Sequence, residues 1–306
     1  IEVTKMTALN EKAVLISVST KSWRATVKNK QATCDLAADK NTTHNWLSVT
    51  QRIVSKDMVQ GPQRIAAASK NYLRGDSPGI LDGKFLPGGL PLWGKNVHIL
   101  PNNLSEQVLR NIGAFQDAFT EAVEDVRKAL PDALRQAQLE NPELAAQIAV
   151  PDVDYICEEK YDFEWALDVI PSSDDIRVDA SKEFVAEVKR SVEERANRKL
   201  KEVTDHTVKA VIKVASHLAK SCEDYDPENK GKSPFRDSTV NQVRELIPVI
   251  RGLNINGDAT IDKAATDLLA AVGNKSADDL RDDDDGRKNV ATKARQVASN
   301  LDQLFN

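Results

Sequence analysis

The sequence predicts an α+β fold in which a small sheet-containing N-terminal domain precedes a mainly helical region with two long helices. Short β-branched runs of strand length lie mainly in the first hundred residues. From residue 103 onward, apolar side chains recur every three or four positions, which is the period of an α-helix. We therefore expect a basic α/β domain over residues 1–102 and an acidic helical region over 103–306, with polar linkers near 223–234 and 273–288.

Local patterns predict the first elements. Residues 13–19 (AVLISVS) form an apolar, β-branched run and predict a strand. Residues 23–27 alternate between polar and apolar and could continue this strand or pair with it. Residues 45–54 fit a strand or a helix equally well. Residues 61–74 predict a helix, because their apolar positions have helical spacing.

A long loop is expected after this helix. Residues 75–94 contain six glycines and three prolines, which interrupt regular structure. Residues 95–100 (KNVHIL) then predict a second strand, which Pro101 ends.

The helical region begins with an apolar stripe that predicts a helix ending near Pro131, followed by a short helix over 141–149. Residues 164–170 could add a strand. The longest element should cover residues 180–222, and roughly 40 residues at 1.5 Å each give a helix of about 60 Å. We expect it to pair with an antiparallel helix or to project outward. Three more helices should follow, the first two capped by Ser238 and Asp258.

Composition excludes several classes of protein. The chain has 306 residues and a net charge of -5, and 41% of its residues are apolar, which is too many for wholesale disorder. No apolar run approaches the roughly 20 residues of a membrane span, so no membrane partner is expected. The three cysteines lie far apart and lack metal-binding spacing, which indicates a reducing cytoplasm.

The net charge hides two opposite blocks. Residues 1–100 carry 14 Lys and Arg against 7 Asp and Glu, a net of +7. Residues 101–306 carry 28 against 40, a net of -12. Such a split indicates a charged partner or an internal electrostatic contact.

The basic block predicts a nucleic-acid-binding surface. Its cations can neutralise phosphates, and an exposed tryptophan can stack on an unpaired base. In the alternative interpretation, the tryptophans belong to the core and the lysines scatter over the surface. The candidate binding residues are Lys21, Trp23, Arg24, Lys28, Lys30, Trp46, Arg52, Lys56, Arg64, Trp93 and Lys95.

Two motifs resemble binding loops but lack residues that such loops require. Residues 87–95 have the glycines and the lysine of a phosphate-binding loop, but Asn96 replaces the required hydroxyl residue and Pro91 lacks an N–H donor. Residues 254–262 resemble the start of a calcium-binding loop. Ala259 and Ala265 stand where that loop needs Gly and Glu, so a turn with a helix cap explains the segment.

The histidines and the acidic residues also lack the spacing of a metal or catalytic site. His206 and His217 are too far apart on one helix to share a metal, and His98 is expected to have a core or surface role. The acidic run 282–285 could be a solvated face, a weak cation site or an imitation of nucleic-acid charge. We expect no cofactor, no metal and no catalytic residue, although scattered carboxylates leave a metal-dependent hydrolase as a third class.

Several segments resemble a family of tailed-phage and mobile-element proteins classed as a domain of unknown function. The shared segments are residues 15–23 (LISVSTKSW), 90–102 (LPLWGKNVHILPN), 128–134 (KALPDAL) and 175–178 (DIRV). The resemblance covers about 250 residues and implies a phage origin and an intracellular setting during infection. It brings no catalytic residues, and it is compatible with single-strand binding, replication-accessory and scaffolding roles.

The leading hypothesis is a non-enzymatic, phage-encoded protein of the infected bacterial cytoplasm that binds nucleic acid, with single-stranded DNA favoured. The acidic helical region would then drive formation of a homo-oligomer or recruit a partner. The alternative is a structural or scaffolding protein that self-assembles through its long helices. In that case the basic domain would dock on the acidic region of a neighbour.

Overall fold

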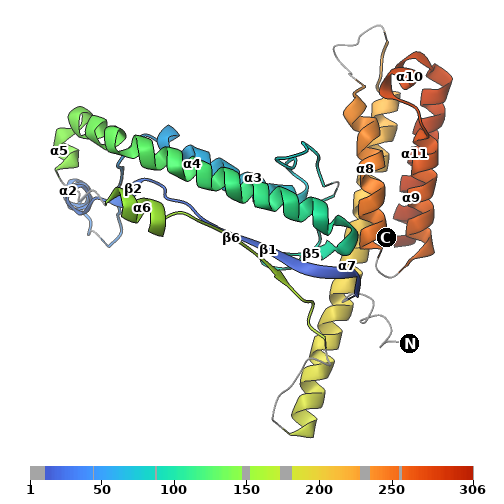
Figure 1. The fold of residues 1–306 in the computed structure, drawn as a ribbon, viewed down its shortest axis with the longest axis horizontal. Coiled ribbons are helices and arrows are strands. Elements are labelled where there is room, and N and C mark those ends of the chain that lie inside the picture. The colour runs from blue at the N-terminus through green and yellow to red at the C-terminus, as the bar shows by residue number, and fades with distance from the viewer. Residues whose placement is uncertain are drawn as a thin grey trace. The chain divides into compact units, whose positions relative to one another are not determined.

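A computed structural model describes residues 11–43, 45–86, 88–146, 152–172, 181–227, 235–254 and 257–305. The predicted α+β class is confirmed, because a small sheet near the N-terminus precedes a series of long helices (Figure 1). The elements, in chain order, are β1 (Ala13–Lys21), β2 (Thr26–Lys28), α2 (Lys30–Asp39), β3 (Thr50–Arg52), η1 (Asp57–Val59), α3 (Gln60–Arg74), β4 (Leu92–Gly94), β5 (Val97–Pro101), η2 (Asn102–Leu104), α4 (Ser105–Glu140), α5 (Pro142–Ala145), α6 (Val153–Glu159), β6 (Asp162–Asp168), α7 (Lys182–Glu223), α8 (Asp237–Leu253), α9 (Ala259–Val272), α10 (Ala277–Asp282) and α11 (Asp284–Phe305).

The main sheet has the strand order β4-β5-β1-β6. Strand β1 pairs antiparallel with β5, with Val14 opposite Leu100 and Ile16 opposite His98. The predicted strands over 13–19 and 95–100 are therefore present and adjacent. Their β-branched residues suit this position, because such side chains pack well on a pleated, buried surface. A second sheet has two strands, β2 and β3.

The chain forms two compact units, each assembled from separate segments. Unit 1 comprises residues 1–17, 71–110 and 166–306, and unit 2 comprises residues 18–70 and 111–165. Both units draw on residues from either side of position 102. An independent domain over residues 1–102 therefore stays a prediction.

The core of unit 2 lies along one face of α4. Phe115, Phe119, Val123 and Val126 are buried at helical spacing, as the apolar stripe predicts. The ring of Phe119 contacts two further aromatic rings, with centroid distances of 5.5 Å to Phe163 and 6.3 Å to Tyr161.

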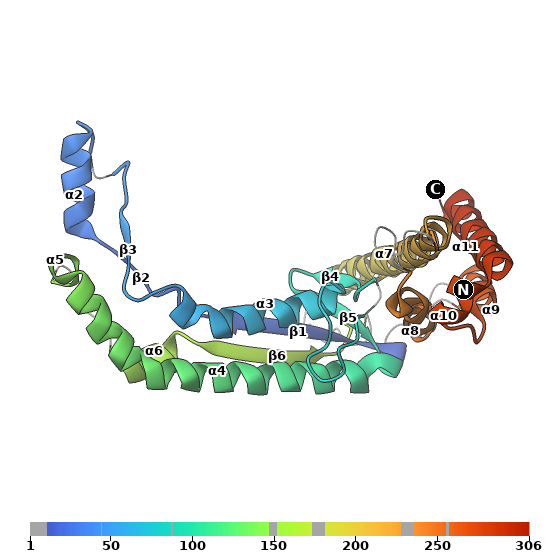
Figure 2. The same ribbon diagram turned by 90° about the horizontal axis from the view of Figure 1, so that it is seen from above.

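The predicted end of α4 near Pro131 is wrong. The helix continues through the proline to Glu140, and Figure 2 shows a change of direction toward its C-terminal end. Pro131 removes one backbone hydrogen bond and crowds the preceding turn. The residues that follow are strong helix formers such as Ala, Leu, Gln and Arg, which explains why the helix resumes.

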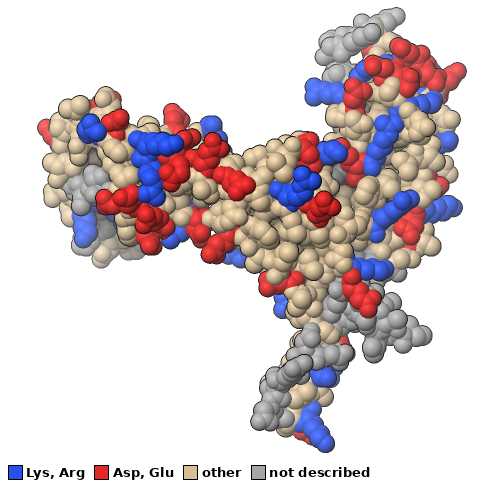
Figure 3. Space-filling view, viewed as in Figure 1, with Lys and Arg blue, Asp and Glu red and all other residues tan. Residues whose placement is uncertain are grey.

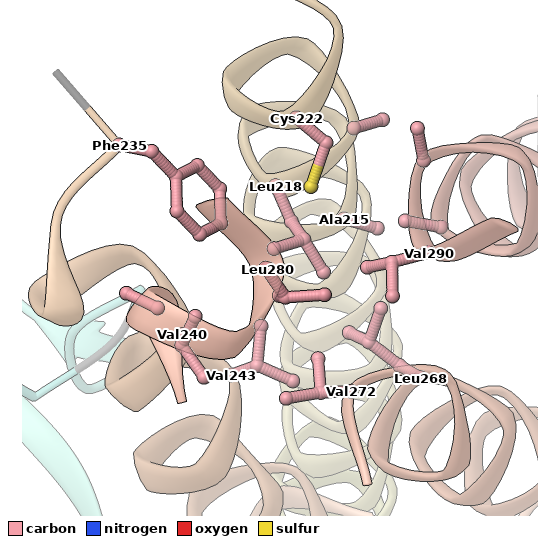
Figure 4. Packing of buried hydrophobic residues seen from close by; sticks show 14 of the residues in the cluster. Ala215, Leu218, Cys222, Phe235, Val240, Val243, Leu268, Val272, Leu280 and Val290 are labelled. Carbon is pink, nitrogen blue, oxygen red and sulfur yellow. The ribbon is translucent and has the colours of Figure 1, made fainter. Parts of the chain in front are cut away.

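The core of unit 1 is a helical bundle of α7, α8, α9, α10 and α11. Helix α7 matches the prediction over 180–222, and the Ser181 hydroxyl caps it by accepting from the Phe184 N–H at 3.3 Å. Figure 4 shows aliphatic side chains from all five helices meeting in one cluster, together with Cys222 and Phe235. In α7, every buried side chain lies between Ala196 and Cys222.

Residues 273–288 were expected to form a linker, but they contain α10 and the start of α11. Ser276 and Asp279 form a reciprocal capping box at the start of α10, and Leu280 is fully buried. The segment has few apolar residues and many charges, so its helical period is hard to detect. The other expected linker, 223–234, overlaps the end of α7, and residues 228–234 lie outside the described ranges.

In the part of the chain that the structure describes, none of the helices is long and apolar enough to cross a membrane.

Candidate nucleic-acid interface

The basic segment of unit 2 contains a small β2–α2–β3 module. Strands β2 and β3 are antiparallel, with Thr26 opposite Arg52 and Lys28 opposite Thr50. Directly opposed residues of an antiparallel pair project from the same face. Lys28 and Arg52 therefore lie on one face of this ribbon, and both are exposed.

Asn29 holds the module together. This residue is 1% exposed, and its side-chain oxygen caps α2 by accepting from the Ala32 N–H at 2.9 Å. Its side-chain N–H donates to Gln51 Oε1 of β3 at 2.8 Å, and its backbone N–H donates to Val49 O at 3.0 Å. A single buried side chain thus joins the start of α2 to β3.

Trp46 lies in the segment between α2 and β3, and its side chain is 84% exposed. The segment is anchored on both sides of the tryptophan. The Thr42 N–H donates to Ala37 O at 2.9 Å, and the Val49 N–H donates to Thr33 Oγ1 at 3.0 Å. We call Trp46, Lys28, Lys30 and Arg52 together the Trp46 surface, because all four belong to this module and all are exposed.

The other two candidate tryptophans are core residues. Trp23 is 9% exposed in unit 2, and its backbone carbonyl accepts from Gln63 Nε2 at 2.8 Å. Trp93 is 8% exposed in unit 1, where the Arg195 guanidinium lies 5.5 Å from its ring centre. Stacking on a base needs an open ring face, so Trp23 and Trp93 are unsuited to the stacking role predicted for them.

The remaining candidate cations of unit 2 flank the module in the sequence. Lys21 and Arg24 precede β2, and Lys56 and Arg64 follow β3; all four are exposed. The hydrogen bond between Gln63 and Trp23 brings the neighbouring Arg64 and Arg24 backbones close together. Lys95 is exposed as well, but it belongs to unit 1 with Trp93.

These cations are available to a ligand. Within the described ranges, Lys21, Arg24, Lys28, Lys30, Arg52 and Lys56 form no ion pair with an acidic side chain. Residues 18–70 hold nine Lys and Arg and three Asp and Glu, a net of +6.

The second segment of unit 2 is acidic. Residues 111–165 hold four Lys and Arg against thirteen Asp and Glu, a net of -9. Its cations have acidic neighbours: Arg127 is paired with Glu124, Asp154 and Glu158. The view in Figure 3 shows blue and red side chains intermixed over α4 and α6. The face in this view is therefore not a continuous basic patch.

The glycine-rich loop has a structural role. A Cβ added at Gly88 would lie 2.5 Å from the Ala210 side chain, and the Gly89 carbonyl accepts from His206 Nε2 at 3.0 Å. The His98 ring is buried and bonds through Nδ1 to Leu90 O at 3.0 Å. Burial lowers the pKa of His98, so its ring is neutral near pH 7. These glycines and histidines pack the loop against α7 and β5.

The other oxygen-rich motif is a helix cap, as expected. Asp258 caps α9 by accepting from the Thr260 N–H at 2.8 Å, and Asn254 Nδ2 donates to Asp262 Oδ1 at 2.9 Å. Among the described residues, no group of three His, Cys, Asp or Glu side chains could hold a metal ion.

The acidic run 282–285 also shapes its own helix. Asp283 Oδ1 accepts from the Gly286 N–H at 2.8 Å, and its other oxygen lies 3.0 Å from Lys275 Nζ. Asp284 pairs with Arg287 and Lys288. The helix N-terminus favours negative charge, which explains the cluster without a ligand.

Sequence reasoning missed α2 and the residues that organise it. Asn29 precedes a run of ten residues without Gly or Pro, and asparagine is a preferred N-cap residue. That signal could have located α2. The partners Thr33 and Gln51 are not predictable in this way, because they meet Val49 and Asn29 only in the folded module.

No family model, curated protein or solved structure matches the chain. The resemblance to tailed-phage proteins stays a prediction.

Proposed function

We propose that the chain binds single-stranded nucleic acid, with single-stranded DNA as the favoured ligand, through the Trp46 surface. The observation that carries this proposal is an indole 84% exposed in the same module as Lys28, Lys30 and Arg52, which form no ion pair with an acidic side chain of the described residues. The resemblance to tailed-phage proteins extends the proposal to a phage-encoded protein in the cytoplasm of an infected bacterium.

The exposed ring supports an unpaired ligand. A base in a duplex already stacks on its neighbours, whereas an unpaired base has a free face for Trp46. Stacking of this kind contributes about 1–3 kcal/mol per base. The flanking cations would neutralise phosphates of the same strand, and this contribution is independent of base sequence. The combination predicts binding with weak sequence preference and strong salt dependence.

Anisotropy of a labelled oligothymidine at low salt tests the proposal. Trp46→Ala should weaken binding by about 5- to 150-fold, because it removes the stacking face. Trp46→Phe should retain most of the affinity, because a ring remains. A wild-type protein that fails to bind at low salt would refute the proposal.

The salt dependence separates phosphate contacts from stacking. Replacing Lys28 or Arg52 with Ala should each reduce the slope of log affinity against log salt by about 0.7 if the residue contacts one phosphate. Lys128→Ala is the matched control, because Lys128 is an exposed lysine of α4 in the acidic segment of the same unit. An equal loss of slope in all three variants would indicate a general charge effect.

A second candidate is a scaffolding protein that self-assembles through α7. Residues 182–195 of this helix have no buried side chain, and Phe184 is 51% exposed. Val185, Val188 and Val192 are half-buried on the same part of the helix. If this surface joins two copies, Phe184→Glu should abolish concentration-dependent association in sedimentation velocity while leaving oligonucleotide binding unchanged.

A further inference from the structure

Helix α7 carries a second group of cations, within the part of the chain where acidic residues predominate. Residues 195–220 contain seven Lys and Arg against two Asp and Glu, a net of +5. Residues 101–306 as a whole have a net of -12, so the acidic excess of this region lies outside the segment. The segment belongs to unit 1, whereas the Trp46 surface belongs to unit 2.

Four of these cations lie on one face of the helix. Arg195, Lys209, Lys213 and Lys220 are separated by 14, 4 and 7 residues, which correspond to about four, one and two helical turns. All four side chains are exposed. At 1.5 Å per residue, the row that they form is about 38 Å long. We call these four residues the α7 stripe.

The α7 stripe faces away from the core of unit 1. Figure 4 shows Ala215, Leu218 and Cys222 pointing from α7 into the core cluster. Lys213 precedes Ala215 by two residues, and Lys220 precedes Cys222 by two residues. Two residues on a helix correspond to a rotation of about 200°, so these lysines project from the opposite face. The bundle therefore fixes the backbone of the stripe and leaves its side chains in solvent.

The cations of the α7 stripe have no acidic partner. Elsewhere in the bundle, arginines of α10 and α11 pair with acidic side chains. Among the described residues, no acidic side chain forms an ion pair with any of the four stripe cations. Glu202 lies on the same face of the helix, but it pairs with Lys199. The positive charge of the stripe is therefore available to attract an anionic ligand.

A buried tryptophan supports the first cation of the stripe. The Arg195 guanidinium lies 5.5 Å from the centre of the Trp93 ring, a distance at which a cation is attracted to the ring face. Trp93 belongs to β4, and the exposed Lys95 follows it in the turn before β5. The contact brings this turn to the N-terminal end of the stripe, so Lys95 adds a fifth cation there.

We propose that the α7 stripe binds the phosphate backbone of duplex DNA. Residues 195–220 contain no Phe, Trp or Tyr, so the segment offers no ring on which an unpaired base could stack. A duplex carries one phosphate charge per about 1.7 Å of its axis, at fixed positions. A straight row of cations on a fixed helix can therefore contact several phosphates without the entropy cost of ordering a flexible strand.

The acidic segment 111–165 of a second copy is a less suitable partner for the stripe. Glu124, Asp125 and Asp132 of α4 each pair with a cation three residues later in their own helix. Docking on the stripe would disturb these pairs, whereas the phosphates of DNA hold only counterions, whose release favours binding. Binding at the stripe does not depend on the Trp46 surface, because its cations belong to a different unit and need no unpaired base.

Anisotropy of the full chain with a labelled, blunt-ended DNA duplex of about 20 base pairs tests the proposal, since this duplex is longer than the stripe. The protein should bind at low salt, and log affinity should fall linearly with log salt. Lys209→Ala/Lys213→Ala should reduce the magnitude of this slope by about 1.8, because each phosphate contact contributes about 0.9.

Lys263→Ala/Lys293→Ala is the matched control. These two lysines are also exposed and belong to the same bundle, but they line the hollow between α9 and α11. The control variant should keep the wild-type slope. Circular dichroism should show unchanged folding in both double variants, because all four lysines are exposed.

Two comparisons separate this proposal from the proposed function. Trp46→Ala should bind the duplex like wild type, because a paired base offers no free face to the ring. The variant Lys209→Ala/Lys213→Ala should still bind oligothymidine through Trp46. Loss of oligothymidine binding with intact duplex binding would therefore refute the proposed function alone.

Three outcomes would overturn duplex binding by the stripe. The first is a wild-type protein that does not bind the duplex at low salt. The second is an equal loss of slope in the stripe variant and in the control variant, which would indicate a general charge effect. The third is self-association in sedimentation velocity that the stripe variant abolishes while its duplex binding is unchanged. That result would assign the stripe to the acidic segment of a second copy.

Discussion

The helical bundle of unit 1 and the core of unit 2 are packed in different ways. The bundle surrounds α7 with α8, α9, α10 and α11 and fills the space with short aliphatic side chains (Figure 4). Unit 2 instead lines one face of a single long helix with aromatic rings, centred on Phe119. Small side chains let several helices approach closely, whereas large rings let one helix cover a small sheet with few residues.

The two regions also differ in the use of charge. In the bundle, Arg281 and Arg287 pair with aspartates three residues away, and Arg295 donates from Nε to Glu223 at 3.1 Å. In residues 18–70 of unit 2, Lys40 pairs with Asp39, but the other exposed cations have no ion pair among the described residues. Charge that is paired locally supports a helix, whereas unpaired charge of one sign is free to attract a ligand.

The largest expected effect is on the aromatic core. Phe119→Ala should destabilise unit 2 by about 3–5 kcal/mol, because it removes a buried ring and leaves a cavity. Leu268→Ala should destabilise the bundle by about 2–5 kcal/mol. Native-state hydrogen exchange measures the protection of the two units separately. Each variant should reduce protection mainly in its own unit, and equal losses in both would show that the units unfold together.

The next largest effect concerns Gly89 in the glycine-rich loop of unit 1. Gly89→Ala should destabilise the protein by more than about 2 kcal/mol, because the residue has φ of +69° and the added Cβ meets Arg74 O. Gly83→Ala is the matched control: its φ is +64°, but nothing lies within 4 Å of the added Cβ. It should lose about 1 kcal/mol from backbone strain alone. Chemical denaturation measures the free energy of unfolding of both variants. Similar losses would show that the backbone at Gly89 can move away from Arg74 O.

As the pH falls, the stability of unit 1 should decrease before that of unit 2. Burial lowers the pKa of His98 below 6.5, so the unfolded chain takes up a proton at a higher pH than the folded chain does. The free energy of unfolding is therefore fully maintained above pH 6.5 and falls as the pH decreases toward the folded pKa. The described residues of unit 2 include no histidine.

Hydrogen exchange at pH 7.5, 6.5 and 5.5 checks this expectation. The protection of β5 should fall relative to that of α4, after correction for the intrinsic exchange rates. His98→Gln should remove the extra pH dependence, and a pH-independent ratio in the wild type would contradict a buried neutral ring.

The smallest expected effect concerns the acidic run 282–285. It distinguishes an aspartate that caps a helix from one that is only solvated. Asp283→Ala should cost about 1 kcal/mol, because it removes the cap at the start of α11. Asp282→Ala should change stability little, since this exposed residue lies at the end of α10. Thermal denaturation of the two variants gives the comparison. Equal melting temperatures would mean that water replaces the cap.

Several elements could be predicted because their signals are local. The apolar periods of α3, α4 and α7 and the cap at Asp258 are patterns of residues a few positions apart in the sequence. The predicted cap at Ser238 is wrong, because α8 begins at Asp237 and Arg236 occupies the cap position without a side-chain hydrogen bond. The end of α4 could not be located, because proline is a strong local signal that the helix formers after it override. Helix α10 was missed for the opposite reason, since only Ala277 and Leu280 mark its buried face.

The candidate interface was predictable as a segment but not as a surface. Sequence alone indicated that the first hundred residues are basic and contain three tryptophans. It could not distinguish Trp46 from Trp23 and Trp93, because burial depends on partners far away in the chain, such as Gln63 and Arg195. It also could not show that residues 18–70 share a unit with the acidic residues 111–165.

The sequence by itself determined the α+β class, the long helices and the opposite charges of the two blocks, because these properties depend on residue order and composition. Only the tertiary structure decided which tryptophan is exposed, which glycines close the 75–89 loop and which apolar side chains remain in water. Those properties depend on contacts between distant residues, and a local pattern carries no information about them.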